Sequence, residues 1–132
     1  MVEDNEADVS LIREAIQATQ LNVIVSVVND GKQAIEFFDR ADGHESLNRP
    51  TLVILDINLP KKQGSEVLKH MRASRRSAQT FVIVVSTSDS QRDRDQMIRL
   101  GANGYFCKPS NYGDFMKLAD LIKSALLQRS ES

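Results

Sequence analysis

Residues 51–60 read TLVILDINLP, an unbroken apolar run that stops at Asp56. Runs of this kind are typical of parallel strands buried on both faces, whereas strands with one wet face alternate apolar and polar residues. A second run, FVIVV at residues 81–85, has the same character. Two such strands separated by helix-like sequence predict a parallel sheet built from right-handed βαβ units.

The rest of the chain continues this alternation of helix and strand. Apolar residues recur at helical spacing in four segments, residues 8–20, 34–38, 65–76 and 111–128. A mostly polar helix is predicted at residues 91–100, ending at Gly101. Strands are predicted at residues 23–28, 51–55, 81–85 and 104–107, and a polar loop at residues 40–50. We therefore expect an α/β fold, with one domain over residues 1–132 and no output domain.

Composition excludes several classes of protein. The chain has 132 residues, with 17 basic and 18 acidic side chains and a net charge of −1, which argues against a nucleic-acid partner. No apolar run approaches the roughly 20 residues of a membrane span, and no signal peptide is recognisable. A single cysteine fits a reducing compartment, so we expect a cytoplasmic protein. A basic cluster is interpreted as a solvated helix face; its members are Lys69, His70, Arg72, Arg75 and Arg76.

Polar side chains follow the apolar runs at the points where strands end. They are Glu3 and Asp4, Asp56, Ser86 and Lys108. The carboxyl ends of parallel strands meet at one edge of a sheet, so these groups should lie together. Crowded carboxylates favour Mg²⁺, a lysine suits a phosphoryl oxygen, and an aspartate can act as a nucleophile. The pattern predicts phosphoryl transfer to Asp56, with Lys108 and Ser86 neutralising charge.

Five motifs together resemble the receiver domain of two-component response regulators, of the chemotaxis-regulator type. They are VEDN at 2–5, LDINLP at 55–60, Gly64, VVSTS at 84–88 and GANGYFCKP at 101–109. The resemblance implies a flavodoxin-like (βα)₅ three-layer sandwich with a central parallel sheet in the order 2-1-3-4-5. It also implies phosphorylation of Asp56 by a sensor histidine kinase with Mg²⁺, for which Mn²⁺ can substitute.

Site roles also follow from the resemblance. Glu3 and Asp4 match the acidic pair that holds the metal together with Asp56, and Asn58 matches the residue that offers its backbone carbonyl. Lys108 matches the lysine of the phosphorylation site. The family catalyses only its own phosphorylation and dephosphorylation, so we expect a signalling domain rather than an enzyme acting on a metabolite.

The resemblance further implies a conformational switch. Ser86 matches the switch hydroxyl, and Tyr105 matches the aromatic residue that changes rotamer on activation. The bond between Lys108 and Pro109 is cis in the family. Phosphorylation is expected to reshape a surface formed by residues 91–100, 104–107 and 111–128.

The N-terminus departs from the family. The first strand of a receiver is central and needs about five apolar residues before the acidic pair, as in an ordinary strand, but only Met1 and Val2 precede Glu3. We expect a truncated first strand, because the sequence begins late. A truly shortened strand, or a strand supplied by another chain, is the alternative.

Two phrases, LDINLPKKQG at 55–64 and VVSTSD at 84–89, resemble single-domain regulators that partner bacteriophytochrome-type kinases. Without an output domain, the signal would pass to an unknown downstream protein or along a phosphorelay, and homodimerisation is open. The main alternative is an interaction module on the same fold that works without phosphorylation. An aspartyl phosphatase is less favoured, since Asn58 stands where a catalytic carboxylate would be needed.

Overall fold

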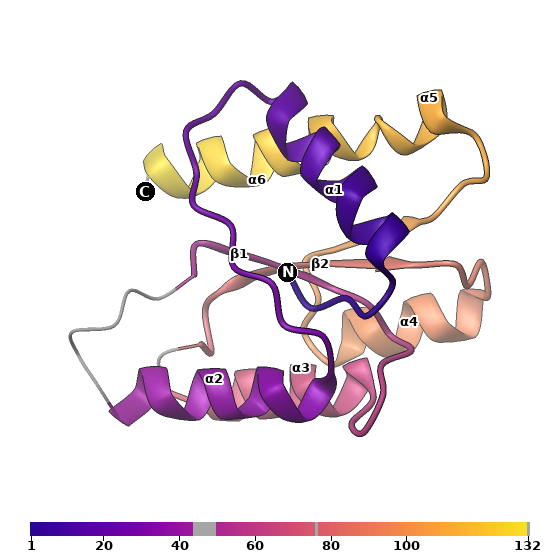
Figure 1. The fold of residues 1–132 in the computed structure, drawn as a ribbon. Helices are drawn as coiled ribbons and strands as arrows, with labels where there is room; N and C mark the ends of the chain where they lie inside the picture. Colours follow the sequence, from indigo (N-terminus) through magenta and orange to yellow (C-terminus); the bar gives the residue numbers. More distant parts are fainter. Residues whose placement is uncertain (44–49, 76, 132) are drawn as a thin grey trace.

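The computed structural model describes residues 1–43, 50–75 and 77–131. A central sheet lies between two helical layers, with α1, α5 and α6 on one face and α2, α3 and α4 on the other (Figure 1). The helices are α1 (Glu6–Ala18), α2 (Gly31–Gly43), α3 (Gly64–Ala73), α4 (Gln91–Arg99), α5 (Tyr112–Phe115) and α6 (Leu118–Glu131). This arrangement confirms the predicted three-layer, flavodoxin-like fold.

The sheet holds three parallel strands in the order β1-β2-β3. Their bounds are Leu52–Leu55 for β1, Phe81–Ser86 for β2 and Gly104–Cys107 for β3. Alternate residues of the apolar runs enter opposite cores: Val82 and Val84 face the core under α2, α3 and α4, while Ile83 and Val85 face the core under α1, α5 and α6. Burial on both faces explains why β2 is continuously apolar.

The first strand of the expected topology is reduced to one residue. Val2 forms parallel bridges to Val28 on one side and to Leu55 on the other. The Val2 amide donates to the Ile54 carbonyl at 2.8 Å, and the Asp56 amide donates to the Val2 carbonyl at 3.1 Å. The segment ending at Val28, the Val2 position and the three strands therefore keep the predicted order 2-1-3-4-5.

The predicted strand at residues 23–28 is wrong except at Val28. Residues 21–27 are irregular, and Ile24 is 98% exposed. A strand needs a neighbouring backbone for its ladder, and among the described residues the backbone partners of residues 21–28 are only Met1 and Glu3. A cleft of about 720 Å³ lies between this segment and β1, with apolar lining that includes Val25 and Leu52.

Other boundaries differ from prediction for local reasons. The predicted loop at 40–50 begins later, because α2 continues to Gly43; residues 44–49 lie outside the described part of the chain. The helix predicted at 111–128 is split into α5 and α6, because the turn between them tightens. There, the Lys117 amide donates to the Asp114 carbonyl at 3.2 Å, three residues back rather than four. No described peptide bond is cis, so the expected cis bond before Pro109 is trans.

Arg72 does not belong to a solvated face. Its guanidinium donates to the carbonyls of Gly101, Ser77 and Ala78 and to the side chain of Asn103, at 2.8–3.2 Å. Gly101 has a φ of +110°, and a Cβ there would lie 2.7 Å from the Arg72 side chain. The arginine therefore joins the end of α3 to the turn that leads into β3.

Within the described residues, no helix is long and apolar enough to cross a membrane.

Hydrogen exchange should distinguish the unpaired segment at residues 22–27 from the paired strand β2. No amide of residues 22–27 donates a hydrogen bond within the described part of the chain, whereas β2 is paired on both sides. We expect amides 22–27 to exchange at least about 100-fold faster than those of residues 82–85 in native-state exchange measured by NMR. Protection of residues 23–27 comparable to that of β2 would contradict this assignment.

Replacing Arg72 with alanine should cost about 1–3 kcal/mol of unfolding free energy, because several partly buried carbonyls lose their donor. Urea denaturation followed by circular dichroism measures this loss. Arg75→Ala, at an exposed position near the end of the same helix, is the matched control and should cost under about 0.5 kcal/mol. Equal losses of unfolding free energy in the two variants would contradict a structural role for Arg72.

Candidate functional site

The predicted acidic residues converge at the carboxyl edge of the sheet. Glu3 and Asp4 follow Val2, and Asp56 follows β1. A carboxylate oxygen from each of the three lies within 4.8 Å of the others. Glu3 and Asp56 are buried, while Asp4 is exposed. The geometry confirms that these three carboxylates share one place.

Lys108 joins this cluster from the end of β3. Its side chain is only 6% exposed, and its Nζ donates to Asp8 Oδ2 at 2.8 Å, Glu3 Oε2 at 3.0 Å and Asp56 Oδ2 at 3.5 Å. Asp8 is a site residue that was not predicted from the sequence. It lies in the first turn of α1, where an acidic residue ordinarily serves the helix terminus. The lysine thus compensates carboxylates from three separate parts of the chain.

Burial dominates the electrostatics of the cluster. Desolvation is the largest influence on the pKa of Glu3 and raises it; the hydrogen bond from Lys108 lowers it, the charge of Asp56 raises it, and the net pKa is about 7. Desolvation lowers the pKa of Lys108, but its bonds to Asp8 and Glu3 outweigh this and keep the pKa above its ordinary value. The ammonium therefore stays charged at neutral pH, and the carboxylates around it outnumber it.

The loop after β1 fixes the backbone around Asp56. The Asn58 amide donates to Asp56 Oδ1 at 3.2 Å, and the Gly64 amide donates to the Ile57 carbonyl at 2.7 Å. A Cβ at Gly64 would lie 2.2 Å from the Asp56 carbonyl oxygen, so a glycine is required where α3 starts against this loop. Asn58 itself is exposed beside the carboxylate cluster.

Ser86 and Tyr105 are connected through Ser88. Ser86 is fully buried at the end of β2, and its Oγ accepts a hydrogen bond from the Ser88 amide at 3.2 Å. The Tyr105 hydroxyl donates to the Ser88 carbonyl at 2.8 Å, and the Arg94 guanidinium lies 5.2 Å from the centre of the half-buried Tyr105 ring. The backbone at Ser88 therefore links Ser86 and Tyr105, the two residues that the family resemblance predicts to form the switch.

The donor set fits a hard divalent cation. Glu3, Asp4 and Asp56 offer only oxygen ligands, two of them from buried side chains, and Mg²⁺ is ordinarily held by few carboxylates plus water and phosphate oxygens. A cation there would offset the excess negative charge that Lys108 alone does not balance.

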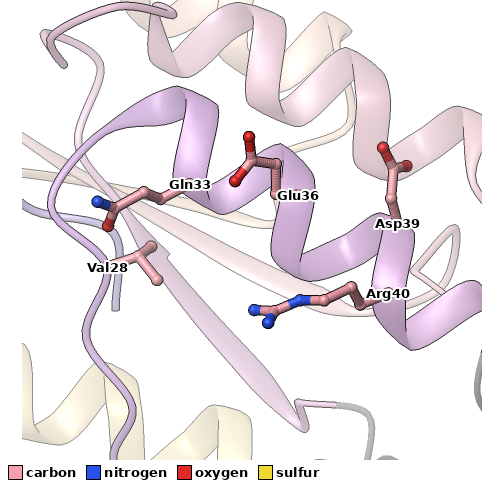
Figure 2. Close-up of a pocket in the computed structure, with 5 residues that line it drawn as sticks. All are labelled: Val28, Gln33, Glu36, Asp39 and Arg40. Carbon is pink, nitrogen blue, oxygen red and sulfur yellow. The ribbon is translucent and has the colours of Figure 1, made fainter.

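A separate pocket lies on α2 beside Val28. It measures about 490 Å³ and is lined by Val28, Gln33, Glu36, Asp39 and Arg40 (Figure 2). Asp39 also pairs with His70 Nε2 of α3 at 2.6 Å. None of the carboxylates at the sheet edge lines this pocket, so it is separate from the acidic cluster.

Comparison with known proteins identifies the family. The pattern of the response regulator receiver domain matches residues 1–120. The chain belongs to this family. It is a receiver domain of two-component signalling, which works through phosphorylation, and it is homologous to phytochrome response regulators.

Three relatives illustrate the similarity. Response regulator Rcp1 of Synechocystis sp. is 32% identical over 128 residues, which cover 97% of this chain and 87% of Rcp1; the structure of its Mn²⁺-bound form has a TM-score of 0.82, 32% identity and coverage of 93% and 88%. The phosphorylated cyanobacterial phytochrome response regulator RcpA has a TM-score of 0.84 at 33% identity and coverage of 96% and 90%. The bacteriophytochrome response regulator RtBRR has a TM-score of 0.74 at 32% identity and coverage of 91% and 74%.

Metal binding by the receiver domain should depend on pH near neutrality. The pKa of Glu3 is about 7, so below that pH the carboxyl holds a proton that a cation must displace. We expect Mg²⁺ affinity to fall by up to about tenfold per unit as pH drops below 7, measured by isothermal titration calorimetry. The Glu3→Gln variant should bind more weakly without this pH dependence. Constant affinity of the unmodified protein between pH 6 and 8 would contradict the raised pKa.

Proposed function

We propose that this receiver domain accepts a phosphoryl group from the phosphohistidine of a sensor kinase onto Asp56. An Asp56 carboxylate oxygen attacks phosphorus, the new O–P bond forms as the P–N bond breaks, and the imidazole leaves with the electron pair. The observation that carries the proposal is the buried Asp56 carboxylate, which shares its site with two further carboxylates and lies 3.5 Å from Lys108 Nζ. Phosphoryl transfer needs such alignment and charge neutralisation.

The metal is assigned to Glu3, Asp4 and Asp56, with the backbone carbonyl of Asn58 as a further ligand. Mg²⁺, or Mn²⁺ in its place, would neutralise charge on the phosphoryl oxygens. The Mn²⁺-bound form of the relative Rcp1 supports this assignment. Lys108 would donate a hydrogen bond to another phosphoryl oxygen, and the buried Ser86 hydroxyl would serve a third.

The switch is assigned to Ser86 and Tyr105. A phosphoryl group adds roughly −1.5 to −2 of charge and three acceptor oxygens, which would attract the Ser86 hydroxyl. Movement of Ser86 would disturb the bond from the Ser88 amide, and Ser88 in turn holds Tyr105. The surface formed by α4, β3, α5 and α6 would then change shape, biasing a conformational equilibrium that exists before phosphorylation.

Partners follow from the same proposal. The likeness to RcpA and RtBRR supports a phytochrome-type histidine kinase as the donor. Acting as a single domain over residues 1–132, the protein would signal by docking to a downstream protein, as a homodimer, or by a phosphorelay. We place it in the cytoplasm and expect it to catalyse its own dephosphorylation but no reaction of a metabolite.

Acetyl phosphate tests the chemistry without a kinase. We expect a single phosphoryl adduct by intact mass, formed only with Mg²⁺ and absent from the Asp56→Asn variant. The ionised carboxylate of Asp56 is the proposed nucleophile, and Asp56→Asn replaces it with a neutral amide. This change should reduce adduct formation by at least about 100-fold. A folded sample that forms no adduct would favour the phosphorylation-independent interaction module instead. An adduct that persists in Asp56→Asn would refute the assignment of the acceptor.

A further inference from the structure

Asp8 is the carboxylate that holds the Lys108 ammonium most closely. An ammonium has three N–H donors, and Lys108 points them toward Asp8, Glu3 and Asp56. The separation is 2.8 Å to Asp8 and 3.5 Å to Asp56. In the unphosphorylated protein the Lys108 ammonium therefore lies closer to Asp8 of α1 than to the proposed acceptor Asp56.

The position of Asp8 is fixed by the start of the helix. Its amide donates to Asn5 Oδ1 at 3.0 Å, which caps α1. Its side chain is 22% exposed, so its ion pair with the nearly buried Lys108 is partly sheltered from solvent. In α1, Ile12 and Ala15 pack into the core with Ile122 and Phe115, and this packing holds the first turn in place.

Asp8 also differs from the other two partners of Lys108 in the chemistry available to it. Glu3 lies in the cluster that fits a cation, and Asp56 is the proposed acceptor. Asp8 is outside that cluster of three carboxylates. Its contact with Lys108 is therefore either a purely structural ion pair or a contact that controls which groups the ammonium binds.

We propose that Asp8 is a positioning residue that competes with the phosphorylation site for the Lys108 ammonium and so slows phosphorylation until the lysine is released. This inference rests on the proposed function. A lysine paired with Asp8 is partly neutralised and makes a weaker bond to an incoming phosphoryl oxygen. Phosphorylation then competes with the Asp8 pair for the same N–H donors, which raises its barrier.

The central test compares Asp8→Asn with Glu6→Gln. The asparagine keeps the shape of Asp8 but removes the charge that holds the lysine. Glu6 is exposed in the same turn of α1, so Glu6→Gln removes an equal charge away from the Lys108 bonds. With acetyl phosphate and saturating Mg²⁺, we expect Asp8→Asn to phosphorylate about three- to tenfold faster than the unmodified protein. Glu6→Gln and the charge-conserving Asp8→Glu should stay within about twofold.

A double-mutant cycle shows whether Asp8 acts through Lys108. The acceleration from Asp8→Asn should vanish in a Lys108→Ala background, whose folding is checked by circular dichroism. Persistence of the acceleration without the lysine would overturn the proposal, as would equal rates for Asp8→Asn and Glu6→Gln.

A second measurement, made without metal, tests the contact between Asp8 and Lys108 independently of phosphorylation. The Lys108 ammonium protons, observed by ¹⁵N NMR, should exchange with water faster in Asp8→Asn and at an unchanged rate in Glu6→Gln. Equal exchange in both variants would show that Asp8 does not hold the lysine. If the unmodified protein takes up no phosphoryl group, the proposed function itself fails, and changed ammonium exchange would still reveal the Asp8 contact.

Discussion

The nearly buried ammonium of Lys108 ties the functional edge of this domain together. It contacts Glu3 near the N-terminus, Asp8 in α1 and Asp56 after β1, while its own backbone amide donates to the Ser86 carbonyl at 2.7 Å. Buried carboxylates without a compensating charge would be costly, since desolvation of an ion amounts to several kcal/mol. The lysine therefore allows four chain segments to end at one place.

The same arrangement leaves the site with an excess of negative charge. One ammonium faces several carboxylates, and the pKa of Glu3 is raised mainly by burial and also by the charge of Asp56. A cation would add the positive charge that the folded chain does not itself provide. In the proposed mechanism, folding and signalling share one set of side chains, and the contacts of Lys108 in the resting domain compete with those that phosphorylation would require.

Support for this edge is uneven across the sheet. β2 is paired on both sides and buried on both faces, and Arg72 secures the turn that leads into β3. On the other side, Val2 alone bridges Val28 and Leu55, and an apolar cleft lies where a longer strand would run. Glu3 follows directly after that single bridge, so the placement of one carboxylate of the proposed metal site depends on the least supported part of the sheet.

Local sequence was sufficient to predict the apolar strands and the residues that follow them. Asp56, Ser86 and Lys108 were identifiable because parallel strands bring their carboxyl ends to one edge, whatever the details of packing. Asp8 and Arg72 were not identifiable, because an acidic residue in a first helical turn and a basic residue on a helix usually serve local or solvated roles. Their partners are distant in sequence, at Lys108 and Gly101, and only the packing of the helices against the sheet brings them together. Residues 23–27 show the converse: their composition favours a strand, but a strand exists only when another backbone lies beside it.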